Sequence, residues 1–420
     1  MTGGRLAAPG SQRGKARTAL PRGFQALIAA QFVSALADNA LLIVAIALLS
    51  AGHWPAWWAP LLKFSFTLAY VVLAPGVGAL ADAWPKARMM MAMNTLKVVG
   101  VLGLVMQVHP LLAFAVVGVG AAAYAPAKYG LVTELVRPHQ LVAANGWIEV
   151  STVCAALAGT ALGGFLVSPW VMAWSQALRP DLPPLQMALL LLLAGYGLAA
   201  LLNLGIPDSG VRYARGAVFP RALVQSFWRE NLCLWRDPEG GLSMAVTTLF
   251  WGAAAVLQFA VLRWAIDVLG LPLDRAAYLQ GSVAVGIVTG AACAGRWVSL
   301  AHATRVLPLG VALGLLVPAV ALVPSWQMAV PLLLLVGVLG GALVVPLNAL
   351  LQHRGHQLLS AGRSIAVQNF NENASVLVTL AVYAGLLAWD VDVRVLMGGL
   401  GLCVAALVAW LALSRRAHGA

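Results

Sequence analysis

The sequence predicts an all-α membrane protein with twelve transmembrane helices in two six-helix bundles. Of its 420 residues, 61% are hydrophobic and only 10% are charged, and the mean hydropathy is +0.87. A soluble domain carries about 25% charged residues. The apolar residues form long unbroken runs, whereas the strands of a membrane β-barrel alternate over about ten residues. A polar stretch at 207–241 divides these runs into six and six.

Each predicted span contains the roughly 20 mostly apolar residues that are needed to cross the hydrocarbon core. Proline and glycine inside several runs are compatible with spanning, because neighbouring helices satisfy the freed backbone groups. In chain order, the predicted spans are 24–50, 58–80, 89–108, 111–132, 141–167, 186–206, 242–265, 276–298, 306–323, 328–351, 362–388 and 393–413. The expected organisation is a basic cytoplasmic tail (1–23), an N-terminal bundle (24–206), a cytoplasmic linker (207–241), a C-terminal bundle (242–414) and a cytoplasmic tail (415–420).

The net charge of +12 reflects membrane topology rather than nucleic-acid binding. With the N-terminus placed in the cytoplasm, twenty of the 26 lysines and arginines lie on the cytoplasmic side and five lie on the opposite side. This imbalance obeys the positive-inside rule and predicts that both termini are cytoplasmic. The first apolar run has no small-residue cleavage site, so we expect a retained helix rather than a signal peptide.

The linker contains an amphipathic segment between Phe219 and Trp235. This segment predicts a helix that lies along the cytoplasmic membrane surface, and docking to a partner is the alternative. The four cysteines are scattered singly through the chain, without the spacing of a metal site or a disulfide framework. We therefore expect no metal and no cofactor.

The two halves of the chain resemble each other weakly. A Gly/Ala-rich segment ending at Pro126 in the fourth span matches one ending at Pro346 in the tenth. Glu149 and Glu372, in the spans that follow, are separated by nearly the same distance along the chain. Two markers at one offset indicate a duplicated six-helix unit in the same orientation, as in major facilitator transporters. Chance similarity between Gly/Ala-rich helices is the alternative.

The loop after the second span has the pattern Gly78-x-x-Ala-Asp82-x-x-x-Lys86-x-Arg88. It resembles the loop motif of the major facilitator superfamily. Gly78 allows two helices to approach closely, and Asp82 is expected to face a helix N-terminus or to pair with Arg88. We predict that this gating loop holds the cytoplasmic gate in one state. An ordinary positive-inside hairpin loop is the alternative.

A polar face on the first span predicts a substrate cavity. A charge at the centre of a spanning helix costs roughly 2.5–3.5 kcal/mol, so each such group needs a partner, water or a function. Gln31 and Asp38 share one face of this helix, and Asn39 is adjacent to Asp38. We predict that these three residues bind substrate. A polar bond that packs two helices is the alternative for Asp38.

Further polar residues inside the spans are predicted to bind substrate. The kink at Pro126 would direct Lys128 inward, although a lysine that snorkels to the interface is the alternative. Lys97 either snorkels or pairs with an acidic group. For the glutamates, hydrogen bonds that tie helices together are the alternative. The remaining predicted binding residues are Asn145, Glu149, Asn348, Gln368, Asn369 and Glu372.

Six sequence blocks together resemble the bacterial lysophospholipid transporter family, over nearly the whole chain apart from the N-terminal tail. They are 31–42 (QFVSALADNALL), 117–130 (VGVGAAAYAPAKYG), 144–152 (ANGWIEVST), 249–252 (LFWG), 344–352 (VVPLNALLQ) and 365–373 (IAVQNFNEN). The resemblance implies a flippase that moves lysophospholipids, chiefly 2-acyl-glycerophosphoethanolamine, inward across the bacterial inner membrane. An acyltransferase/acyl-carrier-protein synthetase on the cytoplasmic side would then reacylate them. One departure is Gln258, where the family has a nearby arginine; here Arg263 lies five residues further, on another helix face.

Two other functions are alternatives to this interpretation. A proton-coupled drug or small-molecule antiporter of the same fold would use Asp38, Glu149 or Glu372 as its protonation site. A membrane-bound lipid-modifying enzyme would need a positioned base, usually histidine. The seven histidines lie in loops or tails, without the spacing of an acyltransferase. The sequence therefore predicts a transporter and not an enzyme.

Overall fold

The computed structural model describes residues 20–54, 58–183, 185–211, 213 and 220–418. The regular elements of these residues are all helices, which confirms the predicted all-α membrane fold. The α-helices are α1 (Arg22–Ala51), α2 (Trp58–Val72), α3 (Ala74–Ala83), α4 (Lys86–Val105), α5 (Pro110–Leu135), α6 (Leu141–Leu166), α7 (Pro169–Leu178), α8 (Gln186–Leu202), α9 (Pro220–Arg236), α10 (Pro238–Asp267), α11 (Leu273–Trp297), α12 (Leu307–Ala321), α13 (Trp326–Leu358), α14 (Ala361–Ala388) and α15 (Val393–His418).

Among the described residues, eleven helices are long and apolar enough to cross a membrane, and the bent pair α2–α3 gives a twelfth if it is one span. The second predicted span, 58–80, is therefore not a single straight helix. Its two parts are bent by 64°. Pro75, in the first turn of α3, explains the break, because proline donates no backbone hydrogen bond and clashes with the preceding turn.

The short helix α7 was not predicted. It has ten residues, too few to span a membrane, and it begins where the Ser168 hydroxyl accepts a hydrogen bond from the Val171 N–H. Proline at its first position is typical of a helix start. Trp170 and Trp174 on its surface are 68% and 54% exposed, so α7 carries aromatic residues on the outside of the molecule.

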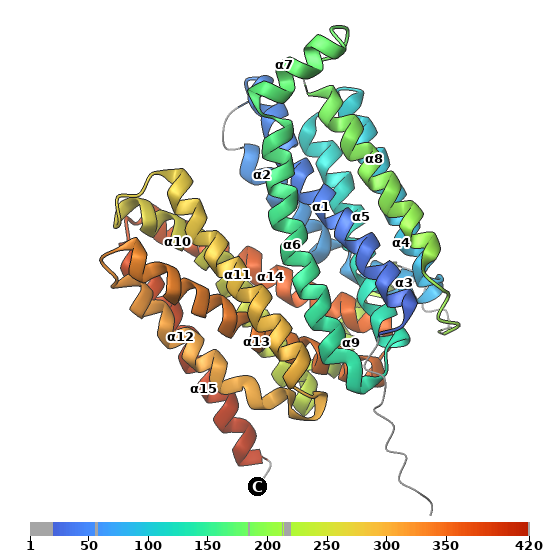
Figure 1. Cartoon of the computed structure of the whole chain (residues 1–420). Helices are drawn as coiled ribbons and strands as arrows, with labels where there is room; N and C mark the ends of the chain where they lie inside the picture. Colours follow the sequence, from blue (N-terminus) through green and yellow to red (C-terminus); the bar gives the residue numbers. More distant parts are fainter. Residues whose placement is uncertain (1–19, 55–57, 184, 212, 214–219, 419–420) are drawn as a thin grey trace, which may run out of the picture.

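The helices form two groups that meet at one end of the molecule (Figure 1). Helices α1–α8 lie on one side and α10–α15 on the other, and their ribbons are farther apart near α7 than near α9. Between the groups, α14 packs against α2, α3 and α5, and α6 packs against α11 and α13. We call the end where α3, α9 and the start of α14 meet the gate end.

Each group has its own hydrophobic core. The core of the first group includes Leu41, Phe114 and Tyr196, and that of the second includes Trp264 and Leu333. These side chains are at most 2% exposed. A third core joins the two groups, because Val142 of α6, Ala291 of α11 and Val344 of α13 belong to one buried apolar cluster.

Candidate functional site

A polar cavity of about 200 Å³ lies inside the first group of helices. Side chains from α1, α2, α4, α5 and α6 line it, and four of them carry a charge: Asp38, Lys63, Lys97 and Lys128. Apolar side chains, including Leu42, Phe66 and Phe114, line the remainder. The cavity therefore presents charge and apolar surface side by side.

Asp38 and Lys97 form an ion pair at the cavity wall, in which Lys97 is buried and Asp38 is partly buried. The Lys97 ammonium lies 2.7 Å from Oδ2 and 2.9 Å from Oδ1 of Asp38, and it also donates to the Ser34 hydroxyl. Tyr196 donates from its hydroxyl to Asp38 Oδ1 at 2.7 Å. Lys97 is only 1% exposed. Of the two alternatives for Lys97, pairing with an acidic group is the one observed, and both carboxylate oxygens of Asp38 are already engaged.

Lys63 and Lys128 are the other two cations of the cavity. The ion pairs among the described residues include neither of them. The Lys128 ammonium lies 4.1 Å from the ring centre of Tyr129, and that of Lys63 lies 5.9 Å from the ring centre of Phe66. The cavity thus carries two positive charges that no carboxylate neutralises directly. Sequence reasoning did not select Lys63, although the signal was available: it is a lysine inside a predicted span.

The other predicted residues of α1 also line the cavity. Gln31 donates to the Ser151 and Thr152 hydroxyls at 3.3 and 3.2 Å, which ties α1 to α6. Asn39 donates to the backbone of its own helix, at Ala35. Both side chains reach the cavity, so the polar face predicted for the first span does face a polar space.

In the second group, three of the predicted residues contact one another. Gln368 donates to Asn348 Oδ1 at 3.0 Å and to Glu372 Oε1 at 2.9 Å. Asn369 is adjacent, and its amide nitrogen is buried without a hydrogen-bond partner. None of these four residues lines the cavity of the first group. The structure places them as a separate polar cluster on α13 and α14.

Asn145 and Glu149 lie on α6, but their surroundings differ. Asn145 exchanges two hydrogen bonds of 2.9 Å with Gln352 of α13, so its amide joins the two groups of helices instead of lining the cavity. Glu149 is 8% exposed. Lys128 acts on it electrostatically. The predicted symmetry of Glu149 and Glu372 does not extend to their partners. The Gln368 amide donates a hydrogen bond to Glu372, whereas the charge of Lys128 acts on Glu149.

The residues of the predicted gating loop lie on helices and not on a loop, with Asp82 on α3 and Lys86 on α4. They close the gate end through Asp82. This carboxylate accepts a hydrogen bond from the Gly362 N–H at 2.9 Å and another from the Ser360 hydroxyl. Gly362 lies in the first turn of α14, where the helix dipole favours a negative charge. Of the two alternatives for Asp82, facing a helix N-terminus is therefore the one observed. Arg88 is exposed on the first turn of α4.

Lys86 and Gly78 complete this contact. The Lys86 ammonium lies 2.6 Å from Glu134 and 3.7 Å from Asp82, with 5% of the residue exposed. A Cβ atom at Gly78 would lie 2.9 Å from the Cβ of Ala366, closer than side-chain carbons pack. Glycine thus allows α3 and α14 to touch. Sequence reasoning missed Glu134, because its distance from Lys86 along the chain gave no signal.

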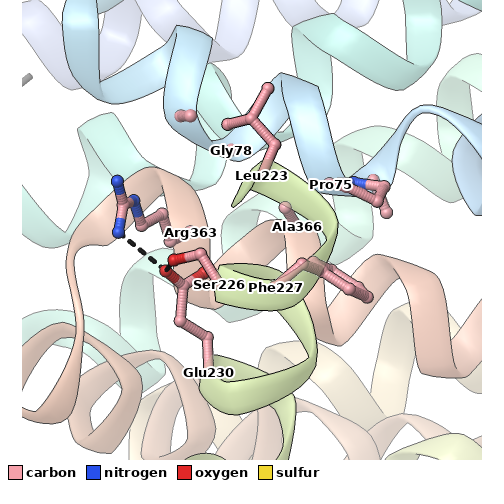
Figure 2. A pocket seen from close by; sticks show the side chains of 10 residues that line it. Pro75, Gly78, Leu223, Ser226, Phe227, Glu230, Arg363 and Ala366 are labelled. Atoms are coloured by element: carbon pink, nitrogen blue, oxygen red, sulfur yellow. Dashed lines mark hydrogen bonds and ion pairs between the residues drawn. The ribbon is translucent and has the colours of Figure 1, made fainter. Parts of the chain in front are cut away.

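Helix α9 also contacts the gate. Its Glu230 lies 2.7 Å from Arg363 of α14 (Figure 2). Arg363 is itself 4.0 Å from Asp82. Just beyond α9, Asp237 accepts from Arg354 at 2.5 and 3.0 Å and from the Gly240 N–H at 2.7 Å, at the start of α10. These hydrogen bonds, with that from Arg354 the strongest, hold the pKa of Asp237 below its usual value.

Comparisons with known proteins agree with this architecture. The family model of the Major Facilitator Superfamily matches residues 27–379. The chain is 42% identical over 376 residues to "Lysophospholipid transporter LplT" of Yersinia enterocolitica, covering 89% of each protein. It is 42% identical over 367 residues to the protein of that name from Yersinia pestis (strain Pestoides F), covering 87% of each.

Solved structures resemble the chain in fold. A bacterial homologue of the iron transporter ferroportin in an outward-facing state has a TM-score of 0.72, with 15% identity over 94% of this chain and 100% of that one. The transporter FucP in its outward conformation also has a TM-score of 0.72, with 15% identity over 93% and 98% of the two chains. At this identity the likeness shows the fold alone.

Proposed function

Because the chain belongs to the lysophospholipid transporter family of the major facilitator superfamily, and is therefore a membrane transporter and not an enzyme, we propose that it flips lysophospholipids inward across the bacterial inner membrane. The principal substrate would be 2-acyl-glycerophosphoethanolamine. Transport would proceed by alternating access, in which the two groups of helices rock about a central path. The observation that carries this proposal is the cavity in which unpaired lysines adjoin apolar side chains.

The cavity matches the two chemical parts of a lysophospholipid. Lys63 and Lys128 can each give a charge-assisted hydrogen bond to the phosphate. Leu42, Phe66 and Phe114 offer apolar surface to the single acyl chain, where each buried methylene is worth about 0.8 kcal/mol. A sugar would use the lysines poorly and would gain nothing from the apolar wall. A substrate with an anionic head and an oily tail fits best.

The ammonium of an ethanolamine head needs a carboxylate. Asp38 is engaged by Lys97 and Tyr196, so it could accept the ammonium only by exchanging partners. Glu149 is buried and is not among the residues that line the cavity, but the charge of Lys128, which does line it, acts on Glu149 electrostatically. We therefore assign the phosphate to Lys128 and the ammonium to Glu149. The cluster around Glu372 would take part when the two groups of helices rearrange.

The gate end is assigned to the cytoplasmic side. The positive-inside distribution of lysines and arginines supports a cytoplasmic position for the gating loop and both termini. With the gate end held by Asp82 and Lys86, this state would accept substrate from the periplasmic leaflet. Transported lysophospholipid would then reach an acyltransferase/acyl-carrier-protein synthetase in the cytoplasm, which is the proposed functional partner.

Reconstitution of the purified protein into proteoliposomes tests the function directly. Labelled lysophosphatidylethanolamine is expected to cross the bilayer faster than in protein-free vesicles, whereas a panel of sugars and drugs is not. An uncoupler distinguishes the alternative antiporter. Drug transport that collapses together with the proton gradient, without lysophospholipid movement, would replace our proposal with a proton-coupled antiporter.

Substitution of the two unpaired lysines is expected to weaken substrate binding. Lys63→Gln and Lys128→Gln should each raise the KM for lysophosphatidylethanolamine about tenfold, because a hydrogen bond to a charged group contributes about 1.5–3 kcal/mol. Initial uptake rates over a range of substrate concentrations give this value. Arg305→Gln, which removes an exposed charge outside the cavity, is the matched control. An unchanged KM in both lysine variants would contradict the phosphate assignment.

A further inference from the structure

Helix α9 has one face that packs against the protein and joins both groups of helices. Phe227 and Leu234 are 3% and 0% exposed. They belong to a small core with Ala74 of α3 and Val367 of α14. Figure 2 shows Leu223 and Phe227 of α9 beside Pro75 and Gly78 of α3, with Ala366 of α14 nearby. The helix therefore bridges the gate from the first group to the second.

A second face of α9 is apolar and exposed. Val224, Trp228, Leu232 and Trp235 are 44%, 52%, 47% and 37% exposed. Their spacing of four, four and three residues places them on one side of the helix. Tryptophan has an apolar body and a polar N–H, and it is enriched where a protein meets the boundary of a membrane. This stripe is therefore suited to a lipid interface and not to water.

A third group of side chains makes α9 strongly basic on the outside. Arg221, Arg229 and Arg236 are exposed. The ion pairs among the described residues include none of these three. The single acidic residue of the helix, Glu230, points inward to Arg363 and is neutralised there. The charged side chains on the outward surface of α9 are therefore all positive.

We propose that α9 binds the anionic phospholipids of the adjacent leaflet and thereby stabilises the closed gate. The apolar stripe would enter the interface while the three arginines contact lipid phosphates. Clusters of arginine at a membrane surface are attracted to the negative charge of anionic lipids. The lipid charge of the membrane thus becomes a regulator of gating. The regulatory part of this proposal rests on the alternating access proposed above.

The contacts of α9 transmit binding to the gate. Arg363 lies between Glu230 of α9 and Asp82 of α3, at 2.7 and 4.0 Å. On the same helix, Trp235 donates to Asn371 of α14 at 3.1 Å, and Asn371 donates to Asn231 at 2.7 Å. When the membrane holds α9, these bonds hold α14 in the position in which its N-terminus meets Asp82.

Hydrogen exchange of the gate segments in lipid nanodiscs tests this proposal without any transport assay. The full-length protein is placed in phosphatidylcholine alone or in phosphatidylcholine mixed with phosphatidylglycerol. Exchange at 360–366, which contains the Gly362 N–H bound by Asp82, is expected to be about tenfold slower in the anionic nanodiscs. The variant R221Q/R229Q/R236Q should lose this difference.

Two further variants make the test specific. R137Q/R296Q/R305Q removes the same number of exposed charges away from α9 and should keep the lipid dependence. E230Q breaks the link to Arg363 while leaving the three arginines in place, so it should bind the anionic surface but no longer slow exchange at the gate. Equal exchange of the wild type in both lipids, or loss of the effect in the control variant, would overturn the proposal and favour a protein partner for α9. Since no substrate is present, failure here leaves the proposed transport function intact.

Discussion

The variant Asp38→Ala is expected to abolish lysophospholipid uptake and to destabilise the protein. The loss of stability is expected because Lys97 would be left without a counter-charge. Removing one partner of a buried ion pair costs about 3–5 kcal/mol, since the other charge stays buried and unpaired. Uptake in spheroplasts and the unfolding temperature in detergent measure the two effects separately.

A double variant that removes both charges of the ion pair separates the effect on transport from the effect on stability. The double variant Asp38→Asn/Lys97→Met removes both charges together and should recover most of the unfolding temperature lost in Asp38→Ala. It should still fail to transport, because Ser34 and Tyr196 would lose the charged partners that hold this wall of the cavity in place. Transport at the wild-type rate by the double variant would show that the ion pair stabilises the fold but is not needed for transport. Unaltered stability of Asp38→Ala would contradict the burial argument.

The second large effect on uptake is expected at the gate, where the substitution of Gly78 by alanine adds a single methyl group. Gly78→Ala places a Cβ 2.9 Å from that of Ala366 and 3.0 Å from the Cα of Arg363. Overpacking of this kind costs about 1–3 kcal/mol. The strain arises only while α3 and α14 are in contact, so it should shift the population away from the closed gate and lower uptake about tenfold.

Cysteine accessibility measures this shift. Ala361 is 0% exposed in the closed gate. In a background without the native cysteines, Ala361→Cys should react slowly with a maleimide, and the additional substitution Gly78→Ala should accelerate the reaction. Gly76→Ala on the same helix is the matched control, because its added Cβ meets no atom within 4 Å. Equal labelling rates for the two alanine variants would show that the close approach at Gly78 does not control the gate.

Some features of the site could be predicted because their signal is local. Asp38 and Lys128 were selected as rare charges inside apolar runs, and the structure places both at the cavity. Lys63 gives the same signal, but it lies near the outer end of its predicted span, where a positive charge is ordinary. Asn145 was selected as a polar residue early in a span, but only its contact with Gln352 shows that it joins the two groups of helices. The tertiary structure decides which side chain a polar residue contacts.

The sequence by itself determined that this chain spans a membrane with α-helices, where nearly all of those helices lie, and to which family it belongs. These properties follow from hydropathy and short motifs, which act over one or two helical turns. The tertiary structure alone decided that Lys97 neutralises Asp38, that Asp82 faces the N-terminus of α14, and that Glu230 directs α9 toward the gate. Each of these contacts joins residues far apart in the chain, because the energy of a charge in a low-dielectric interior depends on its nearest partner and not on its neighbours in sequence.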